Sequence, residues 1–105
     1  MSISISKITG DLAAGKTTAR QHLEACLEAI DSEDGRRAFI TVNSDAARAE
    51  ADRVDVMRAA GAALPPFAGV TLSVKDLFDI AGEITRAGSR VLDGAAPAAR
   101  DCSVV

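Results

Sequence analysis

The sequence predicts an α/β fold, and three observations carry the prediction. Residues 18–30 and 44–60 place apolar side chains at helical spacing. Residues 38–42, with the sequence AFITV, form a short run of β-prone residues. Residues 70–74 alternate between apolar and polar side chains, as the two faces of a strand do. Helices and strands thus share a chain of 105 residues, a length that suits one domain or one piece of a larger domain.

The two long helices have recognisable ends in the sequence. Thr18, with Gln21 three residues later, forms a capping-box pattern at the start of the first helix. Ser44 is the expected N-cap of the second helix. Gly61 is expected to end that helix, because glycine readily adopts the left-handed backbone conformation required just beyond a helix. Charged residues between positions 45 and 55 are expected to form a solvated face, with pairs four residues apart.

The second half is predicted to consist of short strands, turns and brief helical turns. A further short strand is expected within residues 77–85, and residues 87–94 allow one or two helical turns. Asp101 is placed to cap a helix that the last residues would only begin, which suggests a piece of a larger protein. The expected division is residues 1–62, mainly helical with one short strand, and residues 63–105, with the first core strands.

The apolar content of the chain is high, but it comes largely from small side chains. Hydrophobic residues make up 48% of the chain, alanine is the most frequent residue, and aromatic residues account for only 3%. Because alanine buries little area, a core built from this chain alone is expected to be marginal.

The charge pattern and the metal-binding residue types exclude several classes of function. The net charge is −3, and the lysines and arginines form no basic stripe, so we expect no nucleic-acid contact by this segment. Cys26, Cys102 and the single histidine, His22, lack the spacing of a zinc site or a disulfide framework. We expect both cysteines to be free thiols, His22 to be a surface residue, and the chain to need no metal or cofactor.

The chain shows no targeting or membrane-spanning pattern. Its first ten residues lack the charged and apolar regions of a signal peptide. The most apolar later stretch, residues 59–72, is interrupted by Pro65 and Pro66 and is too short to span a bilayer. We therefore expect no membrane association and a cytoplasmic protein.

The stretch GDLAAGKTT, residues 10–18, matches the phosphate-loop pattern of nucleotide-binding proteins. A phosphate loop follows a buried strand, which reads as a continuous apolar run. The only apolar residues within residues 2–9 are alternating isoleucines, a half-exposed pattern at best. We interpret the match as a helix linker, in which residues 11–14 form a helical turn, Gly15 ends it and Lys16 lies in the link. Nucleotide binding is the rejected alternative.

Three blocks of the second half resemble the amidase signature family. They are AGVTLSVKDLFDIAG, the TRAGS that follows, and APAARDCSVV near the end of the chain. The helices and strand expected before them also resemble the N-terminal part of this family. The resemblance implies a mixed sheet covered by helices, incomplete in this chain, and amide hydrolysis by a Ser–cis-Ser–Lys triad without a cofactor. Lys75 stands at the position of the family's catalytic lysine, whereas the family's two serines lie further along than this chain extends.

A lysine in this role has a clear chemical purpose. A serine hydroxyl is a weak nucleophile until a neighbouring base removes its proton. A lysine can serve as that base if burial or nearby positive charge brings its pKa from about 10.4 toward roughly 7–8. From the pattern alone, Lys75 is interpreted as a solvated lysine or as one paired with Asp76, and only the resemblance favours the catalytic role. Nothing in the sequence around Ser73 indicates a nucleophile, and Ser89 is interpreted as a turn or cap residue.

The sequence leaves several functions open. Within the family, it does not separate a small-molecule amidase from the A subunit of a glutamyl-tRNA amidotransferase, and a non-catalytic remnant is a third alternative. The expected partner of the complete enzyme is a small-molecule amide substrate, and a homodimer is left open. Since the chain lacks the family's serines, we expect it to hydrolyse no amide by itself.

Overall fold

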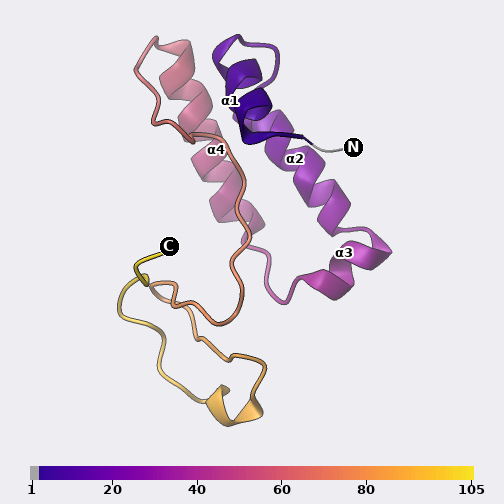
Figure 1. The fold of residues 1–105 in the computed structure, drawn as a ribbon, viewed down its shortest axis with the longest axis vertical. Helices are drawn as coiled ribbons and strands as arrows, with labels where there is room; N and C mark the ends of the chain where they lie inside the picture. The colour runs from indigo at the N-terminus through magenta and orange to yellow at the C-terminus, as the bar shows by residue number, and fades with distance from the viewer. Residues whose placement is uncertain (1–2) are drawn as a thin grey trace. The chain divides into compact units, whose positions relative to one another are not determined.

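The computed structural model describes residues 3–105, which form two compact units with their border between Thr71 and Leu72. We call residues 3–71 the helical unit and residues 72–105 the loop unit. The α-helices of the described residues all lie in the helical unit (Figure 1). None of the helices in the described part of the chain is long and apolar enough to cross a membrane.

The helical unit is built from α1 (Ile5–Ala13), α2 (Ala19–Ile30), α3 (Glu33–Ala38) and α4 (Ser44–Ala59). Helices α2 and α4 lie side by side (Figure 1), and α3 packs against α2. The buried core is made of aliphatic side chains from α1, α2 and α4, namely Leu12, Ala19, Leu23, Ala51 and Val54. The two long helices predicted from apolar spacing are thus present, and they pack through the apolar faces that predicted them.

Helix α1 begins earlier than the helical turn that the sequence predicted over residues 11–14. The Ser4 hydroxyl accepts the backbone N–H of Lys7 at 3.1 Å and caps the helix. Ile8 and Leu12, four residues apart, face the core together. Ile8 therefore follows a helical spacing with Leu12, whereas Ile3 and Ile5 are exposed, so the alternation of the isoleucines did not indicate the helix.

The link between α1 and α2 agrees with its interpretation as a helix linker. Gly15 has a φ of +70° directly after the end of α1. The Lys16 ammonium lies exposed in the link, 4.0 Å from the Asp11 carboxylate. Thr18 and Gln21 form the predicted capping box, in which each side chain bonds the backbone N–H of the other residue. The local prediction for this segment is confirmed.

The prediction of a strand over residues 38–42 is wrong. Ala38 is the last residue of α3, and the following residues pair with no strand in the described chain. The Ser32 hydroxyl caps α3 by accepting the backbone N–H of Gly35 at 3.1 Å. The charges of α3 also complement the helix dipole. Acidic residues occupy its first turn and basic residues its last, namely Glu33, Asp34, Arg36 and Arg37.

The ends of α4 fall close to the predicted positions. Ser44 is the first helical residue, so the N-cap position is Asn43 and the prediction was late by one residue. At the other end, Ala60 is the C-cap and Gly61 follows with a φ of +73°, as predicted. The chain then returns over the helices to Thr71, with Leu64 and Ala68 packed against the core.

The charged face of α4 is not simply a solvated surface with local pairs, as the sequence had suggested. Arg48 binds the Glu24 carboxylate of α2 at 2.8 Å, and Asp52 binds Arg20 of α2 at 2.7 Å. Arg20 also binds Glu24, at 2.7 Å. Hydrogen bonds from Arg48 and Arg20 lower the pKa of Glu24 from 4.5 to about 2. These pairs join α2 to α4 because both helices present charges along their shared edge.

The loop unit contains one short 3₁₀ helix, η1 (Arg90–Leu92), and its described residues form no strand. The strands predicted within residues 70–74 and 77–85 are therefore not formed, because a strand requires a ladder of hydrogen bonds to a neighbour. The backbone of residues 70–74 bonds to no distant segment of the described chain, and residues 77–85 meet one only where the Gly82 N–H donates to the Ala98 carbonyl and the Ala98 N–H to the Glu83 carbonyl, both at 2.8 Å. The helical turn predicted within residues 87–94 is present as η1. The mixed sheet is not shown by the described residues.

The last residues of the chain do not begin a helix. The Asp101 carboxylate accepts the backbone N–H of Ala81 at 2.7 Å instead of capping residues that follow it. Residues 101–105 have no helical conformation. The capping prediction for Asp101 is wrong, since its side chain is committed to a bond with an earlier loop.

Candidate functional site

Lys75 lies in the loop unit at a tight turn that leaves its side chain exposed. Its backbone carbonyl accepts two N–H groups, from Leu77 at 2.7 Å and from Phe78 at 3.1 Å. Within the described residues its ammonium group makes no hydrogen bond or ion pair. The turn therefore fixes the backbone of Lys75 while its amine stays available to groups outside these residues.

Asp76 is not a partner of Lys75, although it follows it directly. Its carboxylate accepts the backbone N–H of Arg86 at 3.1 Å. The Arg86 guanidinium in turn lies 3.3 Å from the Asp93 carboxylate. The alternative in which Asp76 neutralises the lysine is therefore not the arrangement found. Asp76 instead ties the turn of Lys75 to the TRAGS segment.

Two further aspartates hold the loops that follow Lys75. The Asp79 carboxylate accepts the hydroxyl of Thr85 at 2.7 Å, and the Asp79 carbonyl accepts the backbone N–H of Cys102 at 2.9 Å. The Asp101 bond to Ala81 closes the same region. Sequence reasoning missed Asp79 and Thr85. The available signal was a short polar side chain on each side of the turn at Gly82, which can bring the two side chains together.

The TRAGS segment contains a tight turn with two residues in the left-handed region. Ala87 has a φ of 51° and Gly88 a φ of 72°. The Ser89 N–H donates to the Arg86 carbonyl at 2.9 Å across the turn. The Ser89 hydroxyl accepts the N–H of Val91 at 3.3 Å and so caps η1, which confirms its interpretation as a cap residue.

No serine of the loop unit is in contact with a base. Ser73 is exposed, and its hydroxyl makes no hydrogen bond within the described residues. Ser89 is engaged with the backbone of η1. The described residues therefore present a lysine with no nucleophile beside it. They also contain no cluster of three or more histidine, cysteine or acidic side chains suited to a metal ion.

The phosphate-loop match has its helix N-terminus occupied by a side chain of α4. The Asp55 carboxylate accepts the backbone N–H groups of Ala19 at 2.7 Å and Arg20 at 3.0 Å. These are the groups that a phosphate would need at the start of α2. The element before the match is a helix, α1, where a phosphate loop requires a strand. Both observations argue against a nucleotide site around Lys16.

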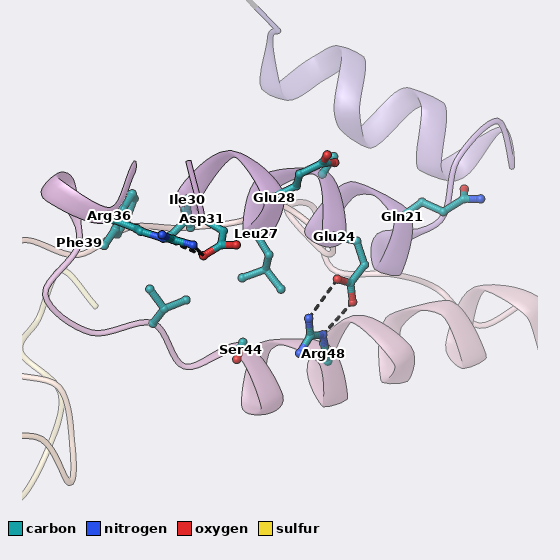
Figure 2. A pocket seen from close by; sticks show the side chains of 12 residues that line it. Gln21, Glu24, Leu27, Glu28, Ile30, Asp31, Arg36, Phe39, Ser44 and Arg48 are labelled. Carbon is teal, nitrogen blue, oxygen red and sulfur yellow. Dashed lines mark hydrogen bonds and ion pairs between the residues drawn. The ribbon is translucent and has the colours of Figure 1, made fainter. Parts of the chain in front are cut away.

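A shallow open groove lies between α2, α3 and the start of α4 in the helical unit (Figure 2). Apolar side chains, among them Leu27, Ile30 and Phe39, line it together with charged and polar ones. Glu24 pairs with Arg48 and Asp31 with Arg36, both at 2.8 Å, whereas Glu28 has no hydrogen-bond or ion-pair partner within the described residues. A single unpaired carboxylate on an open groove is not a site by itself, and we do not assign chemistry to it.

The amidase family matches residues 21–105 of the chain. The chain is 44% identical over 100 residues to AtzE of the 1-carboxybiuret hydrolase of Pseudomonas sp. (strain ADP), covering 94% of this chain and 22% of that protein. It is 41% identical over 98 residues to the A subunit of the glutamyl-tRNA(Gln) amidotransferase of Synechococcus sp. (strain WH7803), covering 90% of this chain and 20% of that protein.

A solved structure is also similar to this chain. It was described under the words "An unexpected vestigial protein complex reveals the evolutionary origins of an s-triazine catabolic enzyme". The TM-score is 0.86 at 43% sequence identity, over 94% of this chain and 22% of the other. The chain thus spans about a fifth of the length of the relatives that it matches.

Proposed function

The chain belongs to the amidase signature family, and from this premise we propose that it supplies Lys75 to a hydrolase that cleaves C–N amide bonds. In this proposal the Lys75 amine accepts the proton of one serine, and that serine activates a second serine to attack the amide carbonyl. Both serines would come from residues outside these 105. The observation that carries the proposal is the family match, which spans the whole Lys75 segment.

The surroundings of Lys75 support this role. Asp76, the acidic neighbour in the chain, is committed to the backbone of Arg86, so it does not neutralise the ammonium. Two bonds to the Lys75 carbonyl hold the backbone in place. A base must be positioned before it can act, and these contacts fix the backbone from which the Lys75 side chain extends.

The burial that a basic lysine needs would have to come from residues that cover the loop unit. Large apolar side chains are exposed there, with Leu72 at 77% and Val91 at 90% exposure, and Leu77 and Phe78 flank the turn of Lys75. Exposed apolar surface of this kind typically marks a contact with other parts of a protein. We propose that residues 70–74 pair as a strand of a mixed sheet when those neighbours are present.

A second candidate function is that of an amidotransferase A subunit. The observation in its favour is the 41% identity to the Synechococcus protein of that name. Both candidates use the same chemistry at Lys75 and differ in the amide that is processed. The substrate would be selected by residues outside this chain.

The proposal can be tested by exchanging segments with a relative. The 100 matched residues of the Pseudomonas protein are replaced by this chain, and hydrolysis of 1-carboxybiuret is measured with any partner protein that the relative requires. We expect activity in the chimera and a loss of at least about 10²-fold in kcat with Lys75→Ala, the usual contribution of a positioned base.

Lys16→Ala is the matched control, since Lys16 is also an exposed lysine, and it should leave kcat unchanged. Thermal melts of the variants separate a catalytic loss from misfolding. A folded, fully active Lys75→Ala chimera would overturn the proposal.

A further inference from the structure

Three polar side chains of the helical unit converge beside α2, and none of them takes part in the proposed amide hydrolysis. The His22 Nε2 atom lies 3.9 Å from the Cys26 Sγ atom. The Thr71 hydroxyl lies 3.5 Å from each of them. A nucleophile, a base and a hydroxyl thus meet at one point on the surface.

The fold explains how this cluster arises. His22 and Cys26 are four residues apart on α2, so they share one face of the helix. Thr71 reaches the same face because the chain after α4 returns across the core at Gly69. His22 and Cys26 are half-buried and Thr71 is exposed, so the cluster lies at the surface of the helical unit.

We propose that Cys26 is a thiol-modification site, at which a low-molecular-weight disulfide forms a mixed disulfide with the chain. The Cys26 sulfur attacks one sulfur of the disulfide, and its proton passes to the His22 imidazole. The S–S bond of the reagent breaks, and the departing thiolate takes up the proton from His22. One protein thiol and one disulfide therefore become one mixed disulfide and one free thiol.

The three groups have distinct parts in this step. The thiolate is the reactive form of cysteine, so a nearby proton acceptor raises the rate of attack. Thr71 can donate its hydroxyl hydrogen to the Cys26 sulfur, which leaves the lone pair of the His22 Nε2 atom free to accept the thiol proton. This site uses neither Lys75 nor any residue of the loop unit, and it stands independently of the proposed amidase function.

The chain carries its own comparison thiol. Cys102 is also half-buried and free. Its backbone N–H bonds the Asp79 carbonyl, but its sulfur has no polar side-chain partner within the described residues. The two thiols differ mainly in the base beside Cys26, which makes their rates directly comparable.

The test measures both thiols in one reaction. The chain is treated with oxidised glutathione at neutral pH, and the mixed disulfides are quantified over time by mass spectrometry of the two cysteine peptides. We expect Cys26 to react about tenfold faster than Cys102. This is a smaller gain than a positioned base gives in an enclosed active site, because the site is open to water.

Two controls identify the cause of the difference. His22→Gln should bring the rate of Cys26 down to that of Cys102, with helicity unchanged by circular dichroism, and Thr71→Val should lower it by a smaller factor. In denaturant, where the cluster is lost, the two thiols should react at similar rates. Equal rates in the folded chain, or a Cys26 rate that His22→Gln does not change, would overturn the proposal.

Discussion

The helical unit and the loop unit are held together by different interactions. The helical unit buries five aliphatic side chains and joins α2 to α4 by ion pairs. In the loop unit no residue is buried, and its loops are tied by aspartate carboxylates and backbone hydrogen bonds. The first unit therefore has a core of its own, whereas the second depends on polar contacts that water can replace.

This difference places the proposed chemistry on the less self-sufficient unit. Lys75 sits on the loop unit, beside apolar side chains that nothing in that unit covers. Segments with few buried contacts unfold locally most easily, and many functional loops are segments of this kind. We infer that the helical unit stabilises the chain, while the Lys75 segment acquires its final environment from residues outside it.

The largest expected effect comes from removing a core side chain. Leu12 is 2% exposed and contacts the rest of the core, so Leu12→Ala should lower the free energy of unfolding by about 2–5 kcal/mol. Leu72 is 77% exposed, and Leu72→Ala should change it by less than about 0.5 kcal/mol. Denaturant unfolding of both variants makes the comparison. Similar losses in the two would show that the units are not stabilised differently.

A smaller effect is expected where the chain crosses the core. A Cβ atom added at Gly69 would lie 2.7 Å from the Leu12 Cδ1 atom, and the residue has a φ of +83°. Gly69→Ala should therefore lower the free energy of unfolding by about 2 kcal/mol or more, because it adds both backbone strain and overpacking. Gly61→Ala, at a φ of +73° in open space, should cost only about 1 kcal/mol. Equal costs would mean that the close approach at Gly69 is relieved by movement.

The loop unit should respond locally to loss of a carboxylate. Asp76→Ala removes the acceptor of the Arg86 N–H, a bond worth about 1 kcal/mol. Exchange of the Arg86 amide hydrogen should then be several-fold faster by NMR. Asp93→Ala removes only the ion pair of the Arg86 side chain and should leave that amide protected. Equal exchange in the two variants would contradict the role of Asp76.

The smallest expected effect is the contribution of Glu24 to stability at low pH. Because Arg48 and Arg20 lower the pKa of Glu24 from 4.5 to about 2 in the folded chain, its contribution is complete above about pH 4.5. It is lost as the pH falls through the folded pKa. Glu24→Gln should flatten the fall in stability between these pH values, whereas Glu28→Gln on the same helix should not. Acid titrations followed by circular dichroism test this.

The helical unit could largely be predicted from its sequence because its signals are local. The capping box at Thr18 and the glycine at position 61 fix helix ends within a few residues, and both were found. The cap at Ser32 is equally local and could have identified α3, which was not predicted and which shares Ala38 with the β-prone run. The ion pairs of Glu24 could not be read from sequence, since their partners lie on another helix.

The loop unit was harder to predict for a physical reason. Residues 70–74 have the alternation of a strand. A strand forms only beside a partner strand, however, and the sequence of residues 70–74 does not show where such a partner lies. Lys75 was identified by its resemblance to the amidase signature family, whereas its contacts are known only from the structure. The bonds of Asp76 and Asp101 join residues ten and twenty positions away. Local patterns carry no information about such partners.

The most direct test of the account is Lys75→Arg in the segment-exchange chimera. A guanidinium keeps a positive charge at this position but stays protonated at working pH, so it cannot accept a proton from serine. If Lys75 is the base, kcat should fall by at least about 10²-fold while the melting temperature stays close to that of the unsubstituted chimera. A folded Lys75→Arg chimera with near-normal kcat would contradict the account and leave Lys75 as a structural cation.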